Sequence, residues 1–339
     1  MTNKVGKIRD VARETGLSIA TISRVMNGAT NVSDKTREIV LKASRELHYV
    51  PNPAARTLST RKSKTIAAII PTIENSVFAK YVSAIEQTLS DEGYALVFAI
   101  SNADPEQESQ AVGKLLGLGA EAFILSGADH SEEMIELFES RNVPYVFTSI
   151  WQPGAEIPTI GYDNFALASQ ALSFLETNGH TNIAIVHGPI ADSDRTASRC
   201  DGARAACSQG TRLAFFETEI SVSGGKQAVE NILSQPAHPS AILCFSDVLA
   251  LGTYFALSER GIRIPLDMSV MGFDNLDWSA HIDPPLTTIN LPARKMGREV
   301  ARQLVDHLEN AEPIRSAQLN GELIDRASVL NIGEVSMKD

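Results

Sequence analysis

From residue 65 onward the chain alternates short apolar runs with longer segments of helical periodicity, and this alternation most constrains its fold. The runs at 66–70, 122–125 and 270–273 consist of apolar residues. Short apolar runs of this kind are typical of strands that are covered on both faces. Strands that alternate with helices form βαβ units, so the pattern predicts parallel sheets flanked by helices.

The alternation runs through the chain twice. Expected strands lie at 66–70, 94–100, 122–125 and 145–148 in the first series, and at 183–187, 213–216, 241–245 and 270–273 in the second. Expected helices of the second series lie at 165–177, 197–208, 226–233, 248–259 and 293–308. Because 339 residues exceed one ordinary core, we expect two α/β lobes with a cleft between them.

Ligands of open parallel sheets bind beyond the carboxyl ends of the strands, so the loops after the expected strands are candidates for a site. Asp274 follows an apolar strand, where its carboxylate either accepts hydrogen bonds from a ligand or caps the local backbone. Arg195 and Arg199 flank a polar loop after another strand, where they either meet a ligand or lie exposed at a helix start. The residue pattern leaves both alternatives open in each case.

The segment 8–27, IRDVARETGLSIATISRVMN, has a different character. Ile8 and the apolar residues three and four positions after it share one face of a short helix. Gly16 marks a sharp turn, and Ser18 offers a side-chain oxygen to cap a second helix. This order is that of a helix-turn-helix, whose second helix can lie in the major groove of DNA. A small helical hairpin without a nucleic-acid partner is the alternative.

Two further features favour DNA binding by this segment. The second helix turns Ile22, Val25 and Met26 inward, which leaves a small, polar outward face with a single arginine. Residues 1–62 carry 12 lysines and arginines against 5 acidic residues, a net charge of +7, whereas the remainder carries 18 against 36, a net charge of −18. A basic head on an acidic body is typical of a protein that touches DNA with one end.

A third helix is expected at 34–47, with Ser33 as its cap and an apolar stripe formed by Ile39, Val40, Ala43 and Leu47. The prolines of YVPNP at 49–53 then break the chain. The next residues suffice for one or two helical turns, which are too short to be stable alone and could fold on docking. A plain flexible linker is the alternative.

Several classes of protein are not supported by the sequence. Cys200, Cys207 and Cys244 lack metal-ligand spacing and are expected to be reduced and structural. No nucleophile motif, phosphate loop or zinc motif occurs, so we expect neither an enzyme nor a cofactor nor a metal. No run reaches the length of a membrane span and no signal-peptide core precedes the first helix, so we expect a cytoplasmic protein without a membrane partner.

At this point the sequence resembles the LacI/GalR family of bacterial transcription regulators over nearly its whole length. The resemblance is carried by the segment 8–27 and by later motifs in the same order: YVPNPAARTL, GYDN at 161–164, SDVLALG at 246–252, VMGFDN at 270–275 and DPPLTTI at 283–289. It implies a helix-turn-helix headpiece and a core of two Rossmann-like lobes of the periplasmic-binding-protein type I. It also implies a homodimer on a palindromic operator.

By position in the family, Ile19, Ala20 and Arg24 look like base-reading residues, and their chemistry agrees. An arginine can donate two hydrogen bonds to guanine, and small apolar side chains can contact a thymine methyl group. The remaining implied contacts are to phosphate or sugar, from Ser18, Thr21, Ser23 and Asn27. In the linker, Leu58 stands where the family carries an intercalating leucine, and Ala54 and Ala55 allow close approach to the minor groove.

The resemblance likewise implies a small-molecule effector in the cleft, with the contacts Phe78, Ser126, Arg199, Ser246 and Asp274. The chain departs from the family pattern at Ser149, Glu219 and Ser246. The effector class therefore stays open among sugars, sugar acids, polyols and nucleosides, with a sugar or sugar derivative favoured.

The domain limits implied are a headpiece at 1–50, a hinge helix and linker at 51–63, and a core at 64–339. Within the core, the N-lobe covers about 64–162 and 292–322, and the C-lobe covers about 163–291 and 323–339. A tail without a leucine heptad indicates a dimer rather than a tetramer. Two hypotheses compete with this one. A solute-binding protein of a transport system is disfavoured because no signal peptide is found, and an enzyme on the same lobes is disfavoured because no catalytic group is found.

Overall fold

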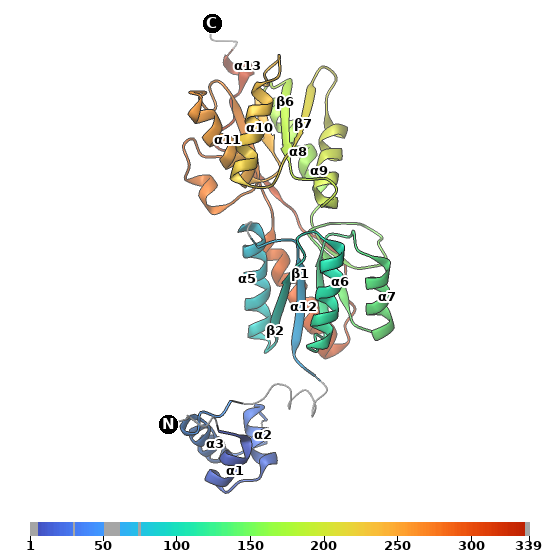
Figure 1. The fold of residues 1–339 in the computed structure, drawn as a ribbon, viewed down its shortest axis with the longest axis vertical. Coiled ribbons are helices and arrows are strands. Elements are labelled where there is room, and N and C mark those ends of the chain that lie inside the picture. The colour runs from blue at the N-terminus through green and yellow to red at the C-terminus, as the bar shows by residue number, and fades with distance from the viewer. Residues whose placement is uncertain (1–5, 30, 51–61, 74–75, 336–339) are drawn as a thin grey trace. The chain divides into compact units, whose positions relative to one another are not determined.

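A computed structural model describes residues 6–29, 31–50, 62–73 and 76–335 of the chain. It divides into two compact units, Met1–Ser63 and Lys64–Asp339. Each unit has its own hydrophobic core. We describe the two units separately (Figure 1).

The first unit contains three helices, α1 (Ile8–Thr15), α2 (Ile19–Met26) and α3 (Asp34–Glu46). Gly16 ends α1 in the left-handed conformation, with φ at +67°, which a glycine adopts without strain. Ser18 and Ser33 accept hydrogen bonds from the backbone three residues later and so cap the next two helices. The local sequence therefore fixes both helix starts and the turn.

Five side chains form the fully buried centre of this small unit: Val11, Ile22, Val25, Val40 and Ala43. Met26 and Leu47 pack against them, as the sequence predicts. The prediction for Ile39 is wrong, because this side chain is 43% exposed. Adjacent residues of a helix point in different directions. Because the apolar stripe of α3 is narrow, the Val40 side chain lies within it and the Ile39 side chain lies outside it.

The second unit contains two six-stranded sheets. The first has the order β11-β5-β4-β3-β1-β2, and its strands are all parallel. Its strands are β1 (Thr65–Ile70), β2 (Ala95–Ile100), β3 (Ala122–Ser126), β4 (Tyr145–Thr148), β5 (Thr159–Gly161) and β11 (Ala317–Gln318). The buried runs of β1 and β3 hold the centre of this sheet.

The second sheet has the order β12-β10-β9-β8-β6-β7 and repeats the same strand plan. Only β12 runs antiparallel to its neighbour. Its strands are β6 (Asn182–His187), β7 (Arg212–Glu217), β8 (Ala241–Cys244), β9 (Ser269–Asp274), β10 (Thr287–Asn290) and β12 (Glu322–Ile324). Two parallel-rich sheets confirm the fold class that the sequence predicts.

Helices cover both faces of each sheet, as parallel sheets require (Figure 1). The first sheet packs against α5 (Ser76–Asp91) and α12 (Ala293–Asn310) on one face, and against α6 (Pro105–Gly117) and α7 (Glu132–Arg141) on the other. The second sheet packs against α8 (Asn164–Thr177) and α9 (Asp194–Ala206), and on its other face against α10 (Val222–Leu233) and α11 (Asp247–Glu259). We call these two assemblies the first and the second lobe.

The chain passes between the lobes three times. It leaves the first sheet after β5, returns between β10 and α12, and crosses again between β11 and β12. These crossings bring the carboxyl ends of both central sets of strands toward one region. A site at that region therefore draws its residues from both lobes.

Expected strand burial is confirmed in the sheet centres and is wrong at one edge. Every residue of β8 and β9 is buried. In contrast, β2 lies at the edge of its sheet, and Phe98 and Ile100 are exposed there. An edge strand has one neighbour fewer, so its apolar side chains are only partly covered.

Candidate functional site

The outward face of α2 is the first candidate site. The Ser18 hydroxyl accepts the Thr21 backbone N–H at 3.1 Å and lies 2.9 Å from the Thr21 hydroxyl. Asn27 donates to the Ser23 hydroxyl at 3.3 Å. These polar side chains are thus held along the helix, where hydroxyl and amide groups remain available for contacts with phosphate or sugar.

Three residues of this face have exposed side chains. Ile19 is 45% exposed, and Ala20 is exposed beside it. The Arg24 side chain is exposed and makes no hydrogen bond or ion pair with the described residues. An exposed isoleucine and an unpaired guanidinium on one face of a capped helix are suited to contacts with base edges. The predicted linker contacts Ala54, Ala55 and Leu58 lie outside the described residues.

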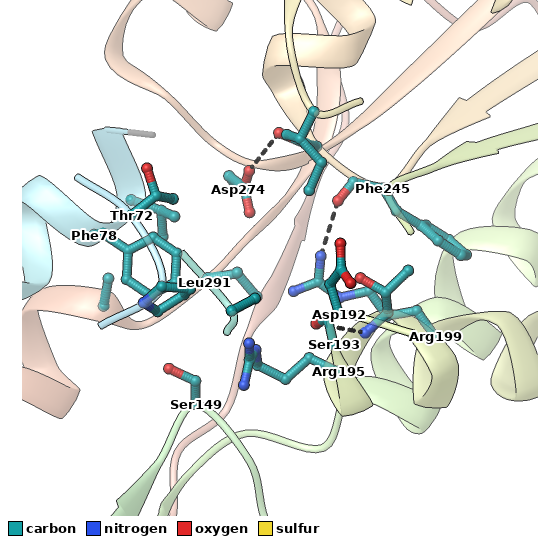
Figure 2. A pocket seen from close by; sticks show the side chains of 18 of the residues that line it. Thr72, Phe78, Ser149, Asp192, Ser193, Arg195, Arg199, Phe245, Asp274 and Leu291 are labelled. Carbon is teal, nitrogen blue, oxygen red and sulfur yellow. Dashed lines mark hydrogen bonds between the residues drawn. The ribbon is translucent and has the colours of Figure 1, made fainter. Parts of the chain in front are cut away.

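The second candidate site is a cavity of about 190 Å³ between the two lobes. Figure 2 shows side chains from both lobes directed into it, with Phe78 on one side and the Arg195 and Arg199 side chains on the other. Phe78 comes from α5 of the first lobe, and Arg199 comes from α9 of the second. The cavity lies where the carboxyl ends of the parallel strands face each other, which is the location that strand topology predicts.

Arg199 is fixed firmly within this cavity. The residue is only 8% exposed, and its guanidinium donates through Nε to Asn164 Oδ1 and through Nη1 to the Phe245 carbonyl oxygen, both at 2.9 Å. It also lies over the Phe273 ring, with Cζ 4.0 Å from the centroid. Burial lowers the pKa of Arg199 from its ordinary value. One edge of a planar, rigidly held donor group is left for a ligand.

Asp274 lies at the end of β9 and is 8% exposed. The Ser246 hydroxyl donates to its Oδ2 at 3.1 Å. Burial raises the pKa of Asp274 to about 7, while Arg199 acts in the opposite direction and the nearby Asp247 adds to the rise. Its backbone φ is +120°, a conformation that a non-glycine residue adopts at a cost. Its oxygens can accept hydrogen bonds from ligand hydroxyl or N–H groups, and near this pKa the carboxyl group can also donate one.

The structure brings together four of the five predicted effector contacts. Phe78, Arg199, Ser246 and Asp274 all line the cavity. Ser126 does not, because it lies at the end of β3 in an adjoining cavity. Ser246 also caps α11 by accepting the Val248 backbone N–H at 3.2 Å, so its hydroxyl links the helix start to Asp274.

Sequence reasoning missed part of the lining of this cavity. Tyr162 follows β5, a strand that the sequence did not predict, and lines the cavity beside Arg199. Asn164, which is outside the lining, accepts the hydrogen bond from Arg199 Nε. Met296 enters from α12, and its sulfur accepts the Ser149 backbone N–H at 3.3 Å. Of the noted departures, Ser149 and Ser246 line the cavity, whereas Glu219 does not. The neighbouring Ile220 takes that place with an apolar side chain.

Two negative findings concern the described residues only. No group of three or more histidine, cysteine, aspartate or glutamate side chains among them could hold a metal ion. None of their helices is both long enough and apolar enough to cross a membrane.

Comparison with protein families gives two matches that together span most of the chain. Residues 7–52 match the family described as bacterial regulatory proteins, lacI family. Residues 63–327 match the family described as periplasmic binding proteins and sugar binding domain of LacI family. Both the helix-turn-helix and the two-lobe core are thus accounted for.

Characterised relatives resemble the chain over nearly its full length. Catabolite control protein A of Priestia megaterium is 32% identical over 314 residues, which cover 91% of this chain and 94% of that protein. The HTH-type transcriptional repressor CytR of Escherichia coli (strain K12) is 31% identical over 331 residues, with 95% of each chain covered.

Solved structures have the same fold. The Lac repressor dimer bound to operator and the anti-inducer ONPF superposes with a TM-score of 0.85 at 28% identity, over 96% of this chain and 100% of that one. A LacI family transcriptional regulator from Enterococcus faecalis V583 with bound ribose gives a TM-score of 0.71 at 27% identity, over 79% of this chain and 99% of that one.

Proposed function

We propose that this chain, which belongs to the LacI family of bacterial regulatory proteins, is a transcriptional repressor whose affinity for a palindromic operator is controlled by a small molecule. The observation that carries the proposal is the joint presence of two sites in one chain. One is the exposed face of α2 with an unpaired Arg24, and the other is the cavity that holds Arg199 and Asp274. The protein is a regulator and not an enzyme.

In the proposed complex with DNA, α2 lies in the major groove. Arg24 reads a guanine, while Ile19 and Ala20 contact a thymine methyl group. Contacts with phosphate or sugar come from Ser18, Thr21, Ser23 and Asn27, whose side chains line the same helix. The linker residues Ala54, Ala55 and Leu58 enter the minor groove between two headpieces of a homodimer. The dimer is supported by the Lac repressor dimer on operator among the similar structures.

In the proposed effector complex, a sugar or sugar derivative occupies the cavity between the lobes. Arg199 donates to a ligand oxygen and Asp274 accepts from a ligand hydroxyl, with Ser246 beside it. Phe78 covers an apolar face of the ligand, as aromatic rings do in sugar sites. Support comes from the matched sugar binding domain and from a similar regulator solved with ribose.

Effector binding is proposed to act through the two lobes. A ligand that contacts both lobes favours one relative arrangement of them, and that preference changes how the linkers present the headpieces to DNA. We retain the domain limits 1–50, 51–63 and 64–339 and a cytoplasmic location as part of this proposal.

The test begins with selection of the operator from random duplex DNA by the purified full-length protein. Recovery of a palindromic sequence, bound by the wild-type protein and discriminated less at one base pair of each half-site by the Arg24→Ala variant, supports the proposal. Sugars, sugar acids, polyols and nucleosides are then screened for a rise in melting temperature, since a ligand that binds only the folded state stabilises it. Hits are added to the operator-binding assay.

Two outcomes would contradict the proposal. Selection that enriches no sequence above random DNA would exclude operator recognition by α2. A stabilising ligand that binds equally well to Asp274→Ala and Arg199→Ala variants would place the effector elsewhere in the molecule. The variant Arg212→Lys, which alters an exposed arginine at the start of β7, serves as the control for the cavity substitutions.

A further inference from the structure

A second cavity, of about 430 Å³, adjoins the first. Its lining comes from the start of α6, the loop between β3 and α7, and the segment before α9. It shares five lining residues with the first cavity: Pro71, Ala103, Asp192, Ser193 and Arg195. A ligand in the first cavity can therefore extend into the second without leaving the protein.

The second cavity has a strong excess of negative charge. Its lining contains one arginine and one histidine against five carboxylates: Asp104, Glu108, Asp129, Asp192 and Asp194. Asp194 is occupied by Arg195, with Nη1 at 3.0 Å, and by the Ala128 backbone N–H at 2.7 Å. Asp104 is likewise satisfied, because it caps α6 by accepting the Glu106 and Gln107 backbone N–H groups and the Gln107 side-chain amide. The remaining three carboxylates have fewer protein donors.

Glu108 is the most buried of them, with only 9% of the residue exposed. Its Oε2 lies 2.9 Å from His130 Nδ1, and its Oε1 makes no hydrogen bond with the described residues. The other ring nitrogen of His130 lies 3.3 Å from the Gly127 carbonyl oxygen. Both ring nitrogens therefore face protein atoms, and the free oxygen of Glu108 remains for a donor inside the cavity.

Three more groups at this location have no protein partner. Asp129 and Asp192 are exposed carboxylates that make no hydrogen bond or ion pair within the described ranges, and Asp192 lines both cavities. The Ser126 hydroxyl oxygen is fully buried and has no protein partner, which holds for no other buried side-chain oxygen or nitrogen in the described part of the chain. A buried unpaired hydroxyl is costly unless a ligand or solvent atom satisfies it.

These acceptors do not form a metal site. The described residues contain no group of three acidic, histidine or cysteine side chains close enough to hold a metal ion. The carboxylates are spread around a cavity that is large enough for an organic group. Such an arrangement suits a protonated amine, which presents three donors and a positive charge to several acceptors at once.

We propose that the second cavity is the amine-binding part of the effector site and that the effector carries a free, positively charged amino group. This inference rests on the proposed function, because it places the remainder of the effector against Arg199 and Asp274. An amino sugar with an unmodified nitrogen has this chemistry. The inference disfavours sugar acids as effectors, because their carboxylate would meet five carboxylates of like charge in the second cavity.

The test measures affinities of the full-length protein for matched probes by calorimetry and thermal shift. The probes are glucosamine, galactosamine and mannosamine, each compared with the parent hexose and the neutral N-acetyl derivative. At least one amine is expected to bind about ten-fold or more tightly than both neutral counterparts. The preference should shrink on raising salt from about 0.05 to about 0.5 M, because ionic strength screens the attraction.

Three variants locate the effect. Glu108→Gln removes the buried charge while retaining an acceptor for His130, and Asp129→Asn/Asp192→Asn removes two carboxylates that have no protein partner. Each is expected to weaken amine binding about five-fold or more relative to binding of the parent neutral sugar. Asp306→Asn on α12, outside both cavities, is the matched control and should change amine binding by less than about two-fold.

Equal or weaker binding of every amine relative to its neutral partners overturns the inference, as does an amine preference that survives in both carboxylate variants. The proposed function is judged separately by operator selection in the absence of any effector. A protein that recognises an operator and shows no amine preference would refute only the present inference. If Glu108→Gln fails to fold, the double aspartate variant still decides the outcome.

Discussion

Asp274 shows how the surroundings of one residue change its chemistry. The same carboxyl group that is ionised at neutral pH on a surface has a pKa of about 7 here, because it is buried. Asp247, also buried, has its pKa raised to about 6 for the same reason. A residue with such a pKa at the end of a strand, beside a fixed arginine, is a candidate for ligand recognition on physical grounds.

The raised pKa predicts a pH dependence of stability. Between about pH 4 and pH 7 the folded state holds a proton at Asp274 that the unfolded state has released, so the free energy of unfolding falls as pH rises through that window. Asp274→Asn removes this dependence, so the free energy of unfolding of the variant should rise relative to wild type by up to about 1.4 kcal/mol per pH unit. Urea unfolding of both proteins at pH 5 and pH 7.5 measures the difference.

The control for this experiment is Asp306→Asn, which alters a partly exposed carboxylate on α12. Its unfolding free energy should follow that of wild type at both pH values. A constant difference between Asp274→Asn and wild type would mean that Asp274 titrates normally in the folded protein.

Arg199 provides a second prediction at this scale. Lysine at position 199 cannot reach Asn164 Oδ1 and the Phe245 carbonyl oxygen together, so Arg199→Lys leaves at least one buried acceptor unpaired. The expected loss is about 1–3 kcal/mol in the free energy of unfolding. Denaturant unfolding measures it, and Arg212→Lys should change stability by less than about 0.5 kcal/mol. A loss no larger than that of the control would contradict the assigned hydrogen bonds.

At the scale of single elements, α2 packs into the headpiece core with one face and carries the proposed DNA contacts on the other. Its buried side holds Ile22 and Val25 in the headpiece core, and its outer side bears Arg24. Because these faces are independent, a change on the outside should alter recognition without altering the fold. The contact between α10 and α11 differs from this, because the two helices pack so closely that no side chain fits between them.

Arg24→Ala is expected to cost about 1–3 kcal/mol in operator binding and to relax discrimination at one base pair in each half-site. The melting temperature should not change, since Arg24 has no partner in the described part of the chain. Fluorescence anisotropy with the selected operator and single-base variants measures both effects. Lys42→Ala removes the same charge from α3 and should leave base discrimination intact. Unchanged discrimination in Arg24→Ala would refute base reading by this residue.

The contact between α10 and α11 depends on Gly225 and Gly252. A Cβ atom at Gly225 would collide with the Leu249 carbonyl oxygen, and one at Gly252 would collide with the Val222 carbonyl oxygen. Gly225→Ala should therefore destabilise the protein by about 1–3 kcal/mol through overpacking. Gly113→Ala on α6 is the matched control, because a Cβ there meets nothing within 4 Å. The free energy of unfolding of Gly113→Ala should be about 0.5–1 kcal/mol higher than that of wild type.

At the scale of the whole core, polar contacts tie the two lobes together on either side of the cavity. Lys80 of α5 forms an ion pair with Asp277 at 2.7 Å and donates to the Asn275 carbonyl oxygen at 3.2 Å. Asp194 accepts the Ala128 backbone N–H at 2.7 Å. These bonds stabilise the arrangement of the lobes in which the proposed effector cavity is formed. We therefore expect them to affect the affinity for the effector more than the stability of the fold.

Lys80→Met is expected to lower effector affinity about two- to five-fold, because the lobes lose a contact that favours the binding arrangement. Its free energy of unfolding should change by less than about 1 kcal/mol, since Asp277 is largely exposed. Lys226→Met is the control, because it removes an ion pair with Glu259 inside one lobe. Calorimetry and urea unfolding measure the two quantities. Equal effector affinity in both variants would exclude a role for the Lys80–Asp277 ion pair in effector binding.

The sequence alone determined the fold class, the capped helices of the headpiece and nearly all of the long strands. These features depend on local patterns, such as the apolar run of β1, Ser18 at a helix start and Gly16 at a turn. The sequence did not predict β5 or β10, because short strands carry too few residues to show a pattern. Burial of Val40 beside an exposed Ile39 likewise depends on which partner reaches each side of α3.

The tertiary structure alone decided the proposed effector site. Arg199 meets Asn164 and the Phe245 carbonyl oxygen, residues 35 and 46 positions away, only after the second sheet and its covering helices have formed. Packing in the same lobe buries Asp274 and raises its pKa, while Ser126 of the first lobe lies in the adjoining acidic cavity rather than in the first. Local propensity fixes helices and strands, whereas burial and long-range neighbours fix the chemistry of the side chains that they carry.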